Sequence, residues 1–265
     1  MLTVLYINLD LEIRRRAHIE TALGQQGITA YRIPGVESRA PIDGFDFASS
    51  LTAPERGCYV SHMRAWNTLL ASDDAHALIV EDDALIPPNL AALADRVISV
   101  LPAGWDIVHL YGDEGRAVKR LRSIGGGHDL VRYSRAPPGA VAYLISRSGA
   151  AKLRAPRTRS WPIDTDLRRP WHYQIDCYGI APPVVGHSTQ FASTLAGKRS
   201  RGRRGIKLTN PLHSPRAAVW NIRKLGLLSW VRCLALNTGR KIGLAAQKIL
   251  LMRTAIHAAA AADAP

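Results

Sequence analysis

Ala77-Leu78-Ile79-Val80-Glu81-Asp82-Asp83 is a short apolar run that ends in three adjacent carboxylates. The apolar part contains β-branched residues and is too short for a helix, which predicts a buried strand. In open α/β sheets, ligands bind beyond the carboxyl ends of the strands, where these acids would lie. The stretch therefore predicts a strand of an α/β sheet with a candidate site at its end.

Strand-like and helix-like segments alternate on both sides of this stretch. Apolar runs predict strands over residues 2–9, 28–34, 105–111, 130–133 and 140–146. Helical spacing and capping signals predict helices over residues 12–26, 51–72, 87–101 and 148–153. The alternation favours an α/β domain with a mostly parallel sheet. Gly125-Gly126-Gly127 indicates a flexible loop, because it lacks the spacing of a phosphate-binding glycine motif.

Three clustered carboxylates repel one another unless a cation or a basic group lies among them. Oxygen ligands of this kind suit Mg²⁺ or Mn²⁺, with diphosphate oxygens completing the coordination shell. Strand alternation would place Glu81 and Asp83 on one side and Asp82 on the other. The alternative is an acidic turn that only caps the helix predicted after it.

The helix predicted over residues 51–72 begins with a capping box, Thr52 followed by Glu55. Glu55, Cys58 and His62 fall on one face of that helix. Polar groups on an otherwise apolar face indicate either a buried hydrogen-bond network or the wall of a site. Their spacing does not match a zinc site.

Two later segments also carry polar residues that suit a site. Asp164, after a proline and an isoleucine, is either a general base or a helix N-cap, and Asp166 follows closely. Residues 188–204 form a polar and basic run that either contacts phosphates or is a solvated linker.

The composition of the chain excludes several classes of protein. It has 265 residues, 47% of them hydrophobic and 21% charged, which argues against wholesale disorder. Three scattered cysteines are too few for a disulfide framework and fit a reducing compartment. The first residues place an apolar run before basic residues, the reverse of a secretory signal, and no stretch reaches the roughly 18 apolar residues of a membrane span. We therefore expect neither a signal peptide nor a membrane-spanning helix.

The positive charge is concentrated at one end of the chain. The formal net charge is +14, and residues 198–265 hold fourteen Lys and Arg but a single acid, Asp263. Such a segment is attracted to polyanions, either an anionic membrane or nucleic acid. It lacks the zinc, homeodomain and RNA-binding signatures of nucleic-acid readers.

Two helices are predicted in this basic end, over residues 214–236 and 240–253, after a basic linker at 197–205. Trp220 and Trp230, beside Lys and Arg, suit a helix that lies in a membrane interface. Packing of these helices on the rest of the chain is the alternative.

Taken together, the motifs resemble glycosyltransferase family 25, the lipopolysaccharide-type galactosyltransferases related to procollagen galactosyltransferases. The resemblance runs from about Leu2 to about Arg199. It rests on an ordered set of motifs: Tyr6-Ile7-Asn8-Leu9 with Arg14-Arg15-Arg16, Glu55-x-x-Cys58-x-x-Ser61-His62-x-x-x-Trp66, Leu78-Ile79-Val80-Glu81-Asp82-Asp83, Trp105-Asp106-Ile107-Val108-x-Leu110, Ala142-Tyr143-Leu144-Ile145-Ser146-x-x-Gly149-Ala150, Pro162-Ile163-Asp164 and Ser193-Thr194. It departs at Asp10-Leu11-Glu12-Ile13, where the family more usually has arginine and proline, so it leaves open which arginine contacts the nucleotide.

The resemblance implies a GT-A-like α/β fold over residues 1–199, with a basic helical tail over 200–265. It implies inverting transfer of a hexose, most often galactose from UDP-galactose, to a saccharide such as lipopolysaccharide, lipooligosaccharide or another cell-surface glycan. A divalent metal, Mn²⁺ rather than Mg²⁺, would assist by stabilising the leaving UDP.

The resemblance also assigns roles to the candidate residues. Asp164 would be the base that deprotonates the acceptor hydroxyl, with Asp166 in reserve. Glu81 and Asp83 would bind the metal. The nucleotide sugar would contact Asn8, Arg14, Glu81, Asp82 and Arg199, and Glu55 and His62 would form the site wall.

The expected partners are a UDP-sugar, a saccharide or glycolipid acceptor, and an anionic membrane surface bound through residues 200–265. No specific nucleic acid is expected, and the predicted location is peripheral, on the cytoplasmic face of the inner membrane. The alternatives are a non-catalytic protein that binds polyanions or nucleic acid through its tail, a catalytically lapsed family member, and a transferase of another sugar.

Overall fold

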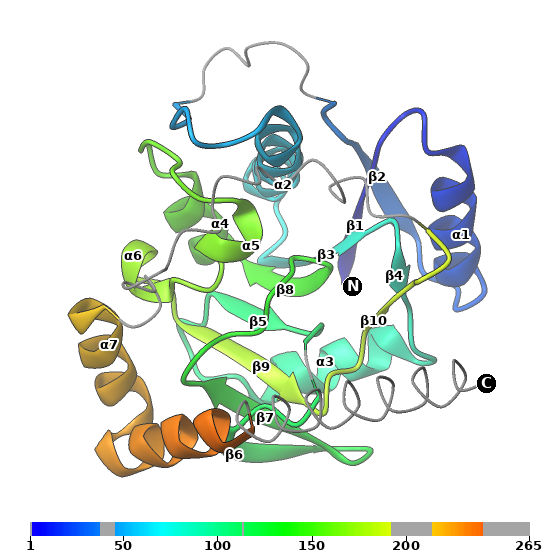
Figure 1. Ribbon diagram of the computed structural model, residues 1–265. Helices are drawn as coiled ribbons and strands as arrows, with labels where there is room; N and C mark the ends of the chain where they lie inside the picture. Colours follow the sequence, from blue (N-terminus) through cyan, green and yellow to red (C-terminus); the bar gives the residue numbers. More distant parts are fainter. Residues whose placement is uncertain (1, 38–45, 113, 192–213, 241–265) are drawn as a thin grey trace, which may run out of the picture.

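The computed structural model describes residues 2–37, 46–112, 114–191 and 214–240, and an eight-stranded sheet lies at its centre (Figure 1). From edge to edge the strands are β2 (Ala30–Pro34), β1 (Thr3–Asn8), β3 (His76–Glu81), β8 (Ala142–Ser146), β5 (Ile107–His109), β9 (Cys177–Ala181), β7 (His128–Tyr133) and β6 (Val118–Gly125). All but β8 and β7 run in the same direction. The predicted α/β fold with a mostly parallel sheet is confirmed.

Helices cover both faces of this sheet. On one face α1 (Ile13–Gly24) and α3 (Leu90–Val100) enclose one hydrophobic core, and on the other α2 (Ala53–Ala71), α4 (Arg147–Arg154), α5 (Ile163–Asp166) and α6 (Pro170–Tyr173) enclose a second. Successive β3 residues alternate between the cores, with Leu78 and Val80 in the first and Ala77 and Ile79 in the second. Burial on both faces explains why β3 is a continuous apolar run.

The predicted capping box at the start of α2 is present. Thr52 Oγ1 accepts from the Glu55 backbone nitrogen at 3.4 Å, and Glu55 Oε2 accepts from the Thr52 nitrogen at 2.9 Å. This reciprocal pair satisfies two backbone donors that α2 itself leaves unpaired. It fixes the helix that carries Cys58 and His62 toward the sheet.

Two strands of the eight-stranded sheet were not predicted. β6 lies at an edge of the sheet and has four consecutive exposed residues, so its sequence shows no alternation of apolar and polar residues. β6 and β7 form a hairpin through Gly125, Gly126 and Gly127, all at positive φ, so the predicted loop is a tight turn. β9 contains Gly179, where a Cβ would lie 2.1 Å from the Tyr133 ring. Its lack of a side chain makes room for that ring.

A second, two-stranded sheet lies next to the carboxyl end of β3. It pairs β4 (Ala84–Leu85) with β10 (Gly186–His187), which are about a hundred residues apart in the sequence. The pairing brings His187 opposite Ala84, directly after the acidic residues.

The described part of the tail begins with α7 (Pro215–Leu225), and helical residues resume over 227–240. Gly226 separates them at φ 81°, so the single helix predicted over 214–236 is divided in two. Asn221 Nδ2 donates to the Ser134 carbonyl at 2.9 Å, and Lys224 Nζ lies 2.7 Å from Asp176 Oδ1. The alternative that the tail packs on the rest of the chain therefore holds for α7.

The boundary predicted at residues 199 and 200 lies outside the described residues, as does nearly all of the helix predicted over 240–253. Within the described ranges, no helix is both long enough and apolar enough to span a membrane.

Candidate functional site

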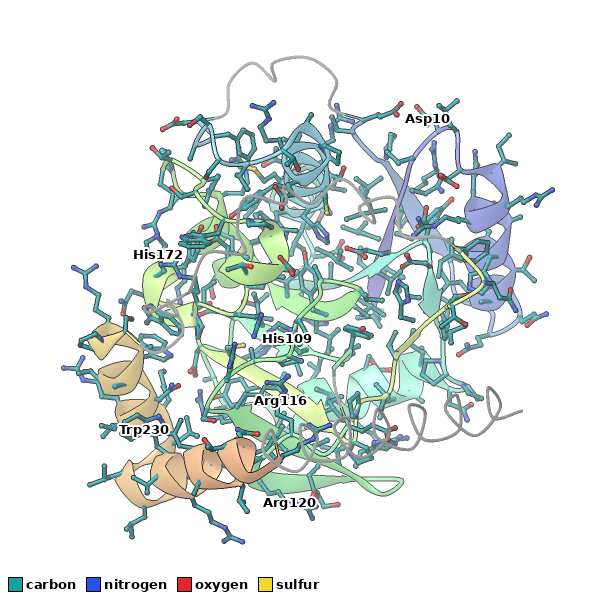
Figure 2. The ribbon with its side chains drawn as sticks, viewed as in Figure 1. Asp10, His109, Arg116, Arg120, His172 and Trp230 are labelled. Atoms are coloured by element: carbon teal, nitrogen blue, oxygen red, sulfur yellow. The ribbon has the colours of Figure 1, made fainter. Side chains whose placement is uncertain are left out.

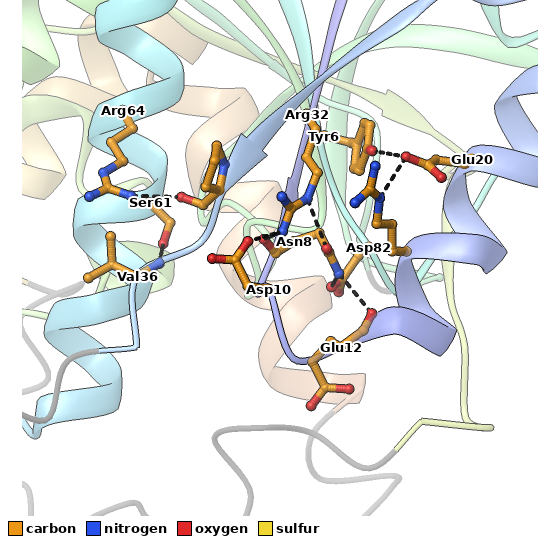
Figure 3. A network of polar contacts seen from close by, with 12 residues as sticks. Tyr6, Asn8, Asp10, Glu12, Glu20, Arg32, Val36, Ser61, Arg64 and Asp82 are labelled. Atoms are coloured by element: carbon orange, nitrogen blue, oxygen red, sulfur yellow. Dashed lines mark hydrogen bonds and ion pairs between the residues drawn. The ribbon is translucent and has the colours of Figure 1, made fainter.

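The carboxyl ends of β1 and β3 lie side by side and bring Asn8 to the acidic residues. Asn8 is buried, and its Nδ2 donates to Asp82 Oδ2 at 2.7 Å. Its Oδ1 accepts from Arg32 Nε at 3.1 Å, and Arg32 Nη2 also donates to Asp10 at 2.5 Å (Figure 3). The two predicted residues Asn8 and Asp82 therefore belong to one network that extends to β2.

One buried arginine supplies positive charge to the acidic cluster. Arg15, on α1, directs its Nη2 to Asp82 Oδ1 at 2.6 Å and to Asp83 Oδ2. The three side chains are each 7% exposed, so the ion pairs offset the cost of burying two carboxylates.

Arg14, one of the residues predicted to contact the nucleotide sugar, is exposed on α1, and the structure brings its neighbour Arg15 to the carboxylates instead. A signal for this was present in the sequence. Ile19 and Leu23 mark the apolar face of the predicted helix. Arg15 lies four residues before Ile19, on the same face, and all three are buried.

The carboxylates do not follow the predicted alternation. β3 ends at Glu81, so Asp82 and Asp83 lie in the turn after it, and both reach the same Arg15 nitrogen. Burial raises the pKa of Asp82 to about 6, although Arg15 opposes the shift. Burial, and then the charge of Glu81, also raise the pKa of Asp83. Burial therefore disfavours the charged form of both carboxylates even with Arg15 in place.

The residues present fit a hard divalent cation. Within the described part of the chain, the buried Asp83 Oδ1 has no hydrogen-bond partner, and neither has the buried Arg15 Nε. Both oxygens of Asp82 are engaged, by Arg15 and by Asn8. Glu81 is 25% exposed. Oxygen donors of this kind are what Mg²⁺ and Mn²⁺ prefer, and Glu81 and Asp83 are the carboxylates that retain free capacity.

His187 adds a further basic group to the acidic cluster. Its Nε2 lies 3.2 Å from Asp83 Oδ2. The sequence analysis did not identify His187, because only the pairing of β10 with β4 brings it there.

A buried chain of hydrogen bonds holds Glu81 from the α2 side. Trp66 Nε1 donates to the Tyr143 hydroxyl oxygen at 2.9 Å, and that oxygen lies 2.9 Å from His62 Nδ1. His62 Nε2 in turn lies 3.2 Å from Glu81 Oε1. Since the indole can only donate, the Tyr143 hydroxyl is free to donate to His62 Nδ1. That assignment leaves the His62 proton on Nε2, directed at Glu81.

Cys58 completes a second cluster around Glu81. The ligand atoms of Cys58, His62 and Glu81 all lie within 4.8 Å of one another, so these residues could also hold a metal ion. Burial, and then the charge of Glu81, raise the pKa of the Cys58 thiol well above its usual value, which disfavours the thiolate that a metal needs. The sequence spacing missed this cluster because its third member comes from β3.

The structure separates the two candidate bases. Asp166 is buried, and its Oδ2 accepts from Tyr59 at 2.9 Å and from Tyr173 at 2.6 Å, while Arg169 lies 3.6 Å from Oδ1. Asp164 is half-buried, and Thr165 Oγ1 donates to it at 3.3 Å. The charge of Asp164, like that of Glu81, helps to raise the pKa of the Cys58 thiol, so Asp164 lies near this cluster and is more exposed than Asp166.

The structure divides the remaining predicted residues. His62 lies at the site, whereas the Glu55 carboxylate serves the capping box of α2. Pro162 occupies the N-cap position of α5, so Asp164 lies in the first turn and is not the cap. Arg199, Ser193 and Thr194 lie outside the described residues.

Curated relatives match part of the chain. "Inactive glycosyltransferase 25 family member 3" of Mus musculus is 26% identical over 185 residues, which cover 62% of this chain and 31% of the relative. "Glycosyltransferase 25 family member" of Aedes aegypti is 28% identical over 187 residues, which cover 60% and 29%. The chain thus spans about a third of the length of these relatives.

A solved structure, "Crystal structure of a glycosyltransferase involved in the glycosylation of the major capsid of PBCV-1", is similar at 11% identity and a TM-score of 0.35, over 72% of this chain and 94% of that one. The sequence model of "Glycosyltransferase family 25 (LPS biosynthesis protein)" matches residues 1–168, which include every described candidate residue except His187. The chain belongs to glycosyltransferase family 25.

Proposed function

We propose that this chain is an inverting, metal-assisted glycosyltransferase that moves galactose from UDP-galactose to a saccharide acceptor. The observation that carries the proposal is the end of β3, where Asp83 keeps a buried oxygen without a partner in the described structure. Family membership supplies the reaction class. The acceptor we propose is lipopolysaccharide, lipooligosaccharide or another cell-surface glycan.

The α1 side of the strand end suits the nucleotide. Arg15 has an unpaired, buried Nε–H within the described structure, beside the carboxylates. A diphosphate oxygen could accept from that group, and the guanidinium charge would favour the anion. Asn8 and Asp82 lie beside this group and are hydrogen-bonded to each other. We propose these three residues as the nucleotide side of the site.

We place the acceptor sugar on the α2 side, where the proposed base Asp164 lies near Cys58. In the proposed step, the acceptor hydroxyl oxygen bonds to C1 of the donor sugar as the bond from C1 to the phosphate oxygen breaks. UDP leaves with the electron pair of that bond, and Asp164 takes the hydroxyl proton. Attack opposite to the leaving group inverts C1. A divalent ion, Mn²⁺ in our proposal, would neutralise charge on the diphosphate, and Glu81 and Asp83 would hold it.

UDP release from a panel of UDP-sugars, with Mn²⁺, with Mg²⁺ and with neither, tests the proposal. We expect turnover of UDP-galactose that needs the metal. Asp164→Asn should lower kcat by roughly 10²–10⁴-fold and leave calorimetric UDP binding unchanged. Asp83→Asn should weaken UDP binding only when the metal is present. Asp95→Asn, at an exposed position on α3, is the matched control.

Each other outcome revises a different part of the proposal. Turnover of another UDP-sugar would replace the donor and keep the residues. Full activity of Asp164→Asn would refute its role as the base. Relatives named inactive occur in this family, and tight UDP binding without turnover on any acceptor would place this chain with them. Absence of UDP binding with metal present would favour a non-catalytic, polyanion-binding protein.

We also propose that the protein works peripherally, on the cytoplasmic face of the inner membrane, where a lipid-linked acceptor would be available. The fourteen Lys and Arg after residue 197 support this location. We expect cell fractionation to recover the full chain with inner membranes at low salt and to release it at high salt. Recovery in the soluble fraction at low salt would contradict it.

A further inference from the structure

The described tail helices have a face that packs against the α/β core. Ala217, Asn221 and Leu225 of α7 are buried, and so is Cys233 in the second helical stretch. Polar contacts fix both helices, since Lys119 Nζ donates to the Leu225 carbonyl at 2.8 Å and the Ala117 nitrogen donates to Asn237 Oδ1 at 3.0 Å. The orientation of the two helices on the sheet edge is therefore set by specific contacts.

The same helices also expose large apolar side chains. Among the described residues, ten large hydrophobic side chains are exposed, and five of them lie between residues 214 and 240. They are Val219, Leu227, Leu228, Val231 and Leu236. Leu228 is 87% exposed, the highest value of the ten. We call these five residues the outer face of the tail.

Trp220 and Trp230, predicted to lie at a membrane interface, are both half-buried. Trp220 lies 5.2 Å from Lys224 Nζ, and Figure 2 shows Trp230 at the opposite end of the view from Asp10, which lies beside the candidate site. The aliphatic residues, rather than the tryptophans, are therefore the most exposed apolar groups of this surface.

The same helices also carry exposed positive charge. Arg216, Arg223, Arg232 and Arg240 are exposed, and the sequence has no Asp or Glu between Asp176 and Asp263. A second copy of this face would meet it with the same positive charge. Nucleic acid would engage the arginines but leave Leu228 in water. An anionic lipid surface satisfies both features, because headgroup phosphates pair with arginine while aliphatic side chains enter the acyl boundary.

We infer that the outer face of the tail docks on an anionic bilayer, with Leu227, Leu228 and Val231 entering the headgroup layer and Arg223 and Arg232 at the phosphates. The choice of a lipid surface as partner rests on the proposed function, in which the acceptor is lipid-linked. The surface itself is defined by exposure and charge alone.

Cosedimentation of the full chain with vesicles tests this inference. The vesicles are phosphatidylcholine alone, or phosphatidylcholine mixed with phosphatidylglycerol. Wild type should bind only the mixed vesicles. Leu228→Ser with Val231→Ser keeps every charge and should weaken binding by about tenfold or more, since the apolar contribution is lost. Arg223→Gln with Arg232→Gln should weaken it by about fivefold for each arginine.

Tyr31→Ser is the matched control, because Tyr31 is 60% exposed on the far edge strand β2. Thermal melting verifies that all variants fold. Equal binding of wild type and the Leu228→Ser, Val231→Ser variant would overturn the inference. Failure of the wild type to bind mixed vesicles would also overturn it. So would a wild-type dimer that the Leu228→Ser, Val231→Ser variant no longer forms.

The same variants separate this inference from the proposed function. UDP release measured with a water-soluble saccharide acceptor should be unchanged in the Leu228→Ser, Val231→Ser variant. If that variant loses vesicle binding but the wild type turns over no UDP-sugar, the membrane-docking inference holds and the proposed reaction is refuted. Normal turnover without any vesicle binding would refute the surface alone.

Discussion

Replacing Tyr143 by phenylalanine removes one oxygen atom from the centre of the protein. Trp66, Tyr143 and His62 are all at most 1% exposed, so no solvent can replace that oxygen. In the variant, the Trp66 indole N–H and His62 Nδ1 both lose their partner. Each buried, unsatisfied group costs about 1–3 kcal/mol.

The two groups together predict a loss of about 2–5 kcal/mol in the free energy of unfolding, reduced somewhat because the buried hydroxyl itself is gone. Against a typical stability of about 5–15 kcal/mol, this is a large fraction. A loss of 3 kcal/mol corresponds to a fall in Tm of about 6–12 °C for a protein of this size. The variant should still fold, but with a smaller free energy of unfolding.

Urea unfolding followed by tryptophan fluorescence measures this loss as a lower midpoint at an unchanged m-value. Tyr31→Phe, on an exposed strand, is the control and should change stability by less than about 0.5 kcal/mol. A double-mutant cycle with Trp66→Phe should give a coupling of about 0.5–3 kcal/mol, because both changes break the same bond. A Tyr143→Phe loss below about 0.5 kcal/mol would refute the hydrogen-bond chain.

Activity gives a second readout of the same variant. Without the Tyr143 hydroxyl, His62 Nδ1 is free to carry the proton, and the bond from Nε2 to Glu81 is no longer fixed. We expect kcat to fall more than KM rises. An unchanged kcat in a folded variant would show that the orientation of Glu81 does not depend on this chain.

Two further predictions concern stability away from the site. Gly149→Ala should lower the free energy of unfolding by about 1–3 kcal/mol, because the new Cβ would lie 2.5 Å from the Asp106 carbonyl oxygen. Gly24→Ala, whose Cβ meets nothing within 4 Å, should raise it by about 0.5–1 kcal/mol. Thermal melting of the two variants compares these effects. Burial alone would raise the pKa of Asp176, but hydrogen bonds from Arg132 and then Lys224 hold it at about 2. Its folded pKa lies below the unfolded value, so its stabilisation is present above about pH 4 and is lost as the pH falls toward 2. Asp176→Asn should therefore cost about 2 kcal/mol at neutral pH and little at pH 2, and a loss independent of pH would contradict this assignment.

Local patterns were sufficient to predict the elements that build the site. The apolar runs that became β1, β3 and β8 are strands buried on both faces, and such strands leave a strong signal. The capping box that starts α2 is equally local. β6 was missed because an edge strand exposes its polar residues, and the division of the tail helix depends on a single glycine, Gly226, whose conformation the hydrophobic pattern does not encode.

Site residues were predictable only where the sequence itself brings them together. Glu81, Asp82 and Asp83 are consecutive, so their cluster was visible directly. The contacts that give them different environments come from other parts of the chain. His187 reaches Asp83 only through the pairing of β10 with β4, and Tyr143 reaches His62 only through the pairing of β8 with β3.

The residue at which β3 ends determines which groups each of these three acids contacts. Because the strand stops at Glu81, this residue alone keeps the orientation of a strand side chain toward α2. Asp82 and Asp83 turn with the backbone and meet the guanidinium of Arg15. If the strand continued through Asp83, alternation would keep Asp82 on the α1 face and turn Asp83 toward the α2 face, away from Arg15. Glu81 and Asp83 therefore approach the site from two sides, and the charge of Glu81 still acts on Asp83, which is consistent with both carboxylates holding one divalent ion.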